Sequence, residues 1–132
     1  MQSFPFAIWN AGQPTPFAPV ITGVPTISGD TGLGDTLTAT PAPVASYPAP
    51  TTVLQWTRDG SDIPGALGTT YTIVEADQPS DIRVRQTSTN SEGFDTATSD
   101  ATAIPSDVPT NAILDRSSDP ILDRSGNYIE VR

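Results

Sequence analysis

The chain has 132 residues, a formal net charge of -9, and no histidine, cysteine or lysine. These missing residue types exclude disulfides, thiolate metal sites, the usual general base near neutral pH and the amine of Schiff-base chemistry. Because these groups are missing, we expect a non-enzymatic protein without catalytic residues, metal or cofactor. The acidic surplus also opposes binding to nucleic acid.

Residues 1–22 form the first predicted element, an extended docking arm. They mix aromatic residues with prolines and show neither helical nor alternating periodicity. Disordered linkers normally lack aromatic residues, so we expect the arm to lie against a partner, with Phe4, Phe6, Trp9 and Phe17 as anchors. The alternative is that the segment folds back on its own domain. We also expect neither a secretory signal nor a membrane span, because no basic start region and no long apolar stretch is present.

Residues 23–105 change to short alternating runs separated by turn residues, the pattern of a β-sandwich. The many prolines and threonines argue against long helices. Trp56 falls on an inward parity, which favours a core position over a ligand platform. Alternation predicts the inward set Leu37, Leu54, Trp56, Tyr71, Ile73 and Val84, with Arg83 and Arg85 outward.

Several runs in this segment occur in a characteristic order: Gly34-Asp35-Thr36-Leu37-Thr38-Ala39, Gln55-Trp56-Thr57-Arg58-Asp59-Gly60, Ile63-Pro64-Gly65-Ala66, Tyr71-Thr72-Ile73 and Ile82-Arg83-Val84-Arg85. With these runs, the segment resembles the immunoglobulin-like repeats common in bacterial surface proteins and phage structural proteins. The resemblance implies a seven-strand-type sandwich with Trp56 on the third strand. Two positions depart from it: Pro79 replaces a usual glycine, and Leu54 a common aromatic residue.

Residues 106–132 contain an internal repeat of eight residues. The run Ile113-Leu114-Asp115-Arg116 is repeated as Ile121-Leu122-Asp123-Arg124, and Ile129 occupies the first position of a third, partial unit. This pattern predicts a short C-terminal β-hairpin or meander. Isolated hairpins of this size are marginal in water, so it should pair with a sheet edge, its own or a neighbour's. The partner-binding candidates here are Ile113, Ile121, Tyr128 and Ile129. The alternative is a disordered acidic tail.

The acidic residues are expected to be solvated turn residues rather than ligands. Asp59-Gly60-Ser61-Asp62 and the acids between residues 115 and 123 offer oxygens, but neither follows a calcium-loop spacing. We expect Arg83 and Arg85 to balance neighbouring carboxylates rather than to bind an anion.

The sequence therefore predicts an all-β fold: an immunoglobulin-like sandwich between two arms. The resemblance implies a spacer, an adhesive unit or a decoration. Because a single immunoglobulin-like domain stands between two arms, we expect a structural protein of a bacteriophage virion. We expect it to be made in the host cytoplasm without a signal peptide. As a capsid decoration or accessory protein, its partners would be the major capsid protein or neighbouring subunits, with a homo-oligomer left open. The alternatives are a tail- or fibre-associated protein, or an adhesive module for host-surface polysaccharide, for which only Tyr47 and Phe94 offer loop aromatics.

Overall fold

The computed structural model describes residues 12–106 and 125–128, and these residues form an all-β protein. One short 3-10 turn, η2 (Glu75–Asp77), interrupts the strands. The strands are β1 (Phe17–Ile21), β2 (Thr26–Ser28), β3 (Thr36–Thr40), β4 (Val44–Tyr47), β5 (Thr51–Arg58), β6 (Ser61–Leu67), β7 (Thr70–Thr72), β8 (Ser80–Asn90), β9 (Gly93–Thr98) and β10 (Thr102–Ile104).

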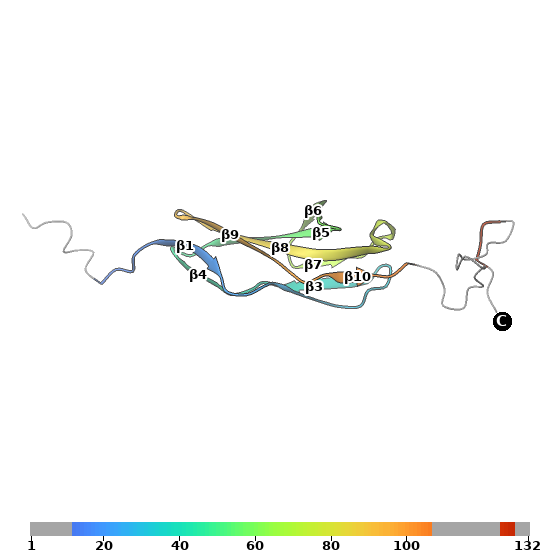
Figure 1. Ribbon diagram of the computed structural model, residues 1–132, viewed down its shortest axis with the longest axis horizontal. Helices are drawn as coiled ribbons and strands as arrows, with labels where there is room; N and C mark the ends of the chain where they lie inside the picture. Colours follow the sequence, from blue (N-terminus) through green and yellow to red (C-terminus); the bar gives the residue numbers. More distant parts are fainter. Residues whose placement is uncertain (1–11, 107–124, 129–132) are drawn as a thin grey trace, which may run out of the picture.

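The strands form two layers of an elongated body (Figure 1). One layer is a five-stranded sheet in the order β10-β8-β5-β6, in which β9 also pairs with β8. The other layer contains the sheet β2-β3-β7 and the two-stranded ribbon β1-β4. Every pairing is antiparallel. The predicted all-β sandwich is therefore confirmed.

The core lies between the five-stranded sheet and the β2-β3-β7 sheet, and it follows the strand parity predicted from the sequence. Side chains of β3, β5, β8 and β10 alternate between buried and more exposed positions, as expected for strands with one covered face. The buried apolar residues are Leu37, Ala39, Leu54, Trp56, Ile73, Ile82, Val84 and Ile104, and Tyr71 packs against them partly buried.

Trp56 is the largest buried side chain of the described residues, with no exposed surface. Its ring stacks on Tyr71 with the centroids 5.6 Å apart. Its indole N–H donates to the Gly68 carbonyl at 3.0 Å, so the polar end of the ring is satisfied. The predicted core role of Trp56 is confirmed.

The structure corrects the end of the predicted N-terminal arm. Phe17 was expected in an arm that ends at residue 22, but Phe17–Ile21 forms β1 and pairs with β4. The pairing shifts register between Phe17 and Val20, where Pro19 lies. Proline occurs in sheets mainly at edges and bulges, so this strand has no regular alternation to recognise. The sandwich therefore begins at Phe17 rather than at residue 23.

Candidate partner-binding surface

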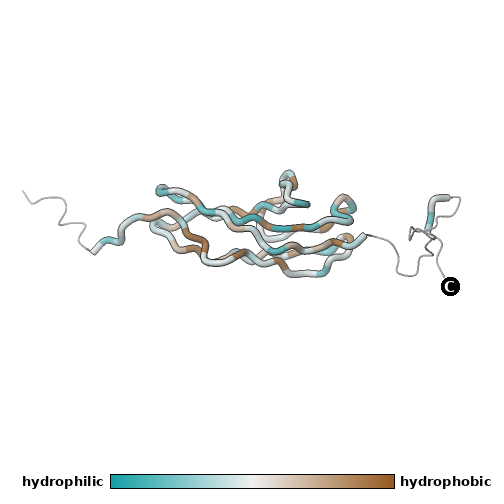
Figure 2. The backbone as a smooth tube through the Cα atoms, in the orientation of Figure 1, coloured by the Kyte–Doolittle hydropathy of each residue, from teal (hydrophilic) through white to brown (hydrophobic). Residues whose placement is uncertain are grey.

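The β1–β4 ribbon has an apolar outer face. Phe17 lies opposite Tyr47, and Val20 lies opposite Ala45. Residues directly opposite each other in an antiparallel pair share a face. The side chains of Phe17, Val20 and Tyr47 are 45%, 51% and 37% exposed, and Ala45 is exposed as well. Figure 2 shows the apolar stretch that β1 contributes. These four residues are called the ribbon face below.

The β8–β9 hairpin fixes this ribbon to the body. The side-chain amide of Asn90 donates to the carbonyls of Phe17 at 2.9 Å and Pro48 at 3.0 Å, which links the start of β1 to the end of β4. The backbone N–H of Ile21 donates to Asp95 Oδ2 at 2.8 Å. A surface that is already fixed loses little conformational entropy when it binds a partner.

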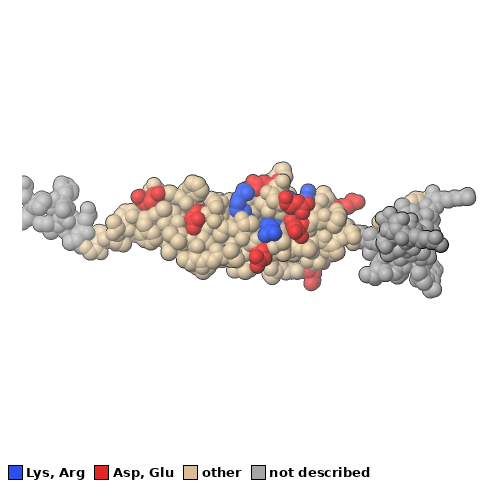
Figure 3. Space-filling view, viewed as in Figure 1, with Lys and Arg blue, Asp and Glu red and all other residues tan. Residues whose placement is uncertain are grey.

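The layer that carries the ribbon face has no charged side chain in its strands. Residues 17–29, 36–47 and 70–72, which include β1 to β4 and β7, contain no Asp, Glu, Lys or Arg. Charges in the described part are concentrated between Arg58 and Asp100. Figure 3 shows most of them over the half of the body with β6 and β7. Interface cores are depleted of charge because charged groups are costly to desolvate, so the ribbon face is well suited to a protein contact.

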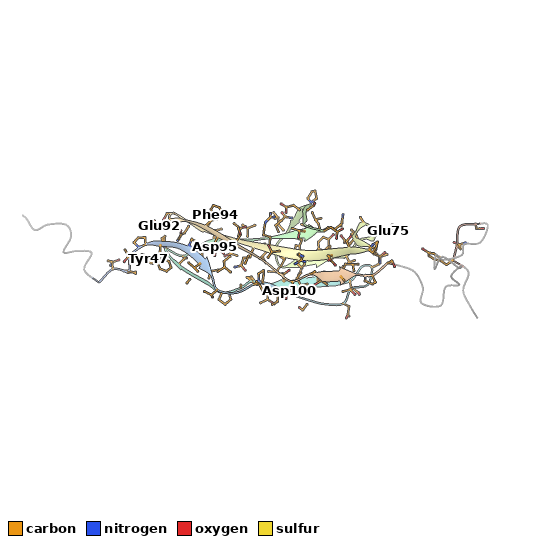
Figure 4. The ribbon with its side chains drawn as sticks, in the orientation of Figure 1. Tyr47, Glu75, Glu92, Phe94, Asp95 and Asp100 are labelled. Atoms are coloured by element: carbon orange, nitrogen blue, oxygen red, sulfur yellow. The ribbon has the colours of Figure 1, made fainter. Side chains whose placement is uncertain are left out.

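Two exposed apolar side chains lie on the outer face of the five-stranded sheet, one on each side of β8. Phe94 is 70% exposed and Val53 is 47% exposed, and each lies opposite a threonine of β8. Figure 4 places Phe94 and Tyr47 at the same end of the body. They lie on opposite faces, however, because Asp95, next to Phe94 in β9, is turned towards β1.

The structure describes two of the predicted anchors. Phe17 belongs to the ribbon face, and Tyr128 is 41% exposed at an isolated β-bridge position. The other anchors lie outside the described residues: Phe4, Phe6, Trp9, Ile113, Ile121 and Ile129. Sequence reasoning missed Val20 and considered Tyr47 only for a glycan site. The absence of charge from residues 17–29 is a signal that could have identified this surface.

Among the charged groups in the described part, the Asp77 carboxylate accepts the most hydrogen bonds, and it has no exposed surface. It accepts hydrogen bonds from Arg58 Nε at 2.7 Å, the Tyr71 hydroxyl at 2.9 Å and the Val74 N–H at 2.8 Å. The bond to Asp77 raises the pKa of Arg58. Burial, followed by the bond to Asp77, raises the pKa of Tyr71. Because the protein itself satisfies this carboxylate, the cluster has a structural role.

Two acids of the β5–β6 hairpin also have partners within the chain. Asp62 forms an ion pair with Arg85 at 2.8 Å, and Asp59 Oδ1 accepts the Asp81 N–H at 2.9 Å. Arg83 donates to the Ser99 carbonyl at 3.2 Å. Within residues 12–106 and 125–128, no three acidic side chains converge on a place for a metal ion. Those ranges also hold no helix with the length and hydropathy of a bilayer span.

A scan against protein-family models and searches of the curated proteins and of the solved structures found no match to this chain.

Proposed function

We propose that the chain is a non-enzymatic structural module that attaches to a larger protein assembly through the ribbon face and the N-terminal segment that leads into it. The observation that carries this proposal is the position of three exposed large apolar side chains, Phe17, Val20 and Tyr47, on a layer without charged strand residues. Exposed apolar patches of this kind are typical of protein contacts. The opposite layer, whose strands carry Asp62, Asp81, Arg83 and Arg85, then faces solvent.

The assembly that we propose is a bacteriophage particle, in which the chain serves as a capsid decoration or accessory protein. Its partners would be the major capsid protein or neighbouring subunits. The support is the resemblance of residues 23–105 to immunoglobulin-like repeats of phage structural proteins. The net charge of -9 fits a displayed, soluble surface that avoids nonspecific contacts.

Co-sedimentation tests this proposal. Particles are purified from the strain that carries the gene, examined by mass spectrometry for the chain, and incubated with the purified full-length protein. The chain should be found in the particles, and added protein should sediment with them but stay in the supernatant when centrifuged alone. Particles that lack the chain and leave added protein in the supernatant would contradict the proposal.

A second candidate function is an adhesive module for host-surface polysaccharide, which the exposure of Phe94 favours. An exposed aromatic ring flanked by threonine hydroxyls can stack on a sugar and bond its hydroxyl groups. Retention on immobilised host polysaccharide is the test. Phe94→Ala should abolish retention, whereas Val20→Asp should leave it unchanged. Equal retention of both variants and the unmodified chain would exclude Phe94 as the binding platform.

A further inference from the structure

One side of the sandwich is closed by the chain itself, and the other side is open. On the closed side, the Gly68 N–H donates to the Leu54 carbonyl at 3.0 Å, and the next residue, Thr69, accepts the Ala39 N–H at 2.7 Å. The chain thus crosses there from one layer to the other. On the opposite side lie β2 and β10, the outer strands of their respective sheets, which are not paired with each other in the described part.

On β2, the backbone groups of Ile27 point to this open side. Ile27 lies opposite Ala39 of β3. The Ala39 N–H bonds to Thr69 on the β7 side, so Ala39 is turned away from β2. In an antiparallel pair, two opposite residues either exchange both hydrogen bonds or exchange neither. The N–H and the carbonyl of Ile27 are therefore directed away from β3.

On β10, the backbone groups of Ala103 also point to the open side. Ala103 lies opposite Asp81 of β8. The Asp81 carbonyl accepts the Asp59 N–H at 2.9 Å, and the Asp81 N–H donates to Asp59 Oδ1. Both backbone groups of Asp81 are thus turned away from β10, so those of Ala103 point outward. Among the described residues, the backbone groups of Ile27 and Ala103 have no partner, so each of the two strands presents a donor and an acceptor to which another strand can bond.

A pocket of about 200 Å³ lies at this opening, and its lining combines both layers: Pro25, Thr26 and Ile27 from one, and Asp100, Ala101 and Thr102 from the other. Figure 4 places Asp100 along this edge of the body. The pocket is smaller than the roughly 300 Å³ at which small-molecule sites begin. Its size suits side chains of an added strand rather than a metabolite.

We propose that the open side accepts an added strand, and that the strand is the C-terminal repeat, residues 113–132, of a second copy of the chain. This segment contains β-branched residues at regular spacing, which favours strand pairing. Its three arginines offset three of its four acidic residues, so the segment carries only one unit of the net charge of -9. A segment this close to neutral adds little repulsion when it lies beside Asp100 of an acidic copy.

The path of the chain after β10 explains why the tail reaches a second copy. Pro105 follows Ile104 directly, and a residue before proline is restricted to extended backbone. Residues 105 and 106 continue along the long axis, away from the body (Figure 1). Two copies that meet at this end exchange their tails reciprocally, which gives a closed two-fold dimer. The exchange needs no particle, so it is independent of the proposed attachment.

Sedimentation velocity of the full chain over a wide range of concentration tests the exchange, with Ala103→Pro as the main variant. Proline removes the outward N–H and leaves the bonds between β10 and β8 intact, whereas Ala103→Thr retains the donor. The unmodified chain and Ala103→Thr should dimerise. Ala103→Pro and the double variant Ile121→Asp/Ile129→Asp should weaken dimerisation about tenfold or more.

Amide hydrogen exchange distinguishes tail swapping between two copies from binding of the chain's own tail, even if Ala103→Pro fails to fold. In the unmodified chain, the amide hydrogens of Ile27 and Ala103 should exchange about tenfold more slowly as the protein concentration is raised and the dimer forms. The double variant Ile121→Asp/Ile129→Asp should remove this protection. Protection in a monomer, at every concentration, would mean that the chain's own tail fills the opening and would overturn the proposal. A monomer without protection would overturn it too, whatever the chain does with particles.

Discussion

The side-chain amide of Gln86 forms two hydrogen bonds with the backbone of Ala42: it accepts the Ala42 N–H at 2.7 Å and donates to the Ala42 carbonyl at 3.0 Å. Ala42 lies between Pro41 and Pro43, where β3 has ended and β4 has not begun. Both prolines lack an N–H, so no regular ladder can continue there. Gln86 has no exposed surface and takes the place of a strand neighbour, which ties this bend to β8.

Replacing Gln86 by methionine should lower the free energy of unfolding by about 2–4 kcal/mol, because two backbone groups of Ala42 lose their partner in a buried site. Urea denaturation measures the difference. Gln78→Met is the matched control, since the Gln78 side chain is only partly buried. Equal losses in both variants would show that the Gln86 bonds add nothing to stability.

Trp56→Ala should cost about 3–5 kcal/mol, because it empties the largest buried site of the core. Phe94→Ala removes an aromatic ring of which 70% is exposed, so its effect should stay within about 0.5 kcal/mol. Thermal unfolding of the two variants checks the contrast. A Trp56→Ala protein with the melting temperature of the unmodified chain would contradict the core assignment.

The two ion pairs should differ strongly in their contribution to stability. Arg58→Met leaves the fully buried Asp77 carboxylate without a counter-charge and should cost about 3–5 kcal/mol. Arg85→Met breaks an exposed pair with Asp62 and should cost less than about 1 kcal/mol. Urea midpoints compare the two variants directly. Similar losses would mean that burial of Asp77 is not what makes its pair important.

Stability should fall in alkaline solution through Tyr71, whose pKa in the folded protein is raised by burial and by the bond to Asp77. The folded state keeps the Tyr71 proton at pH values where the unfolded chain has released it. The stabilisation is therefore complete below about pH 10 and is lost as the pH rises through the folded pKa. Urea midpoints between about pH 8 and pH 11 should decline less steeply for Tyr71→Phe. Parallel declines would contradict this coupling.

The core could be predicted because each of its strands has one covered face. Leu54 and Trp56, for example, alternate with more exposed residues, and the period of two is visible in the sequence. The buried polar residues gave no such signal. Gln86 shares the inward parity of Val84, but its partner Ala42 lies 44 positions earlier and bonds through the backbone, which no side-chain pattern reports.

The candidate site could be predicted only in part. Phe17 was recognised as an anchor because a large aromatic residue stood among prolines, but its strand was hidden by Pro19 and the register shift. The pairing of β1 with β4 brings Phe17 beside Tyr47, and sequence spacing cannot show this contact. One practical consequence is that deletion of residues 1–22 would remove a sandwich strand, so a test of the arm should end before β1.

The most direct measurement of the central claim is co-sedimentation of surface variants with purified particles. The double variant Val20→Asp/Tyr47→Asp places charge on the ribbon face, and Val53→Asp/Phe94→Asp places the same charge on the outer face of the five-stranded sheet. Melting temperatures first establish that both proteins are folded. The ribbon variant should stay in the supernatant, while the other variant should sediment with the particles as the unmodified chain does. A ribbon variant that loads at full occupancy, or a loss confined to Val53→Asp/Phe94→Asp, would contradict attachment through the ribbon face.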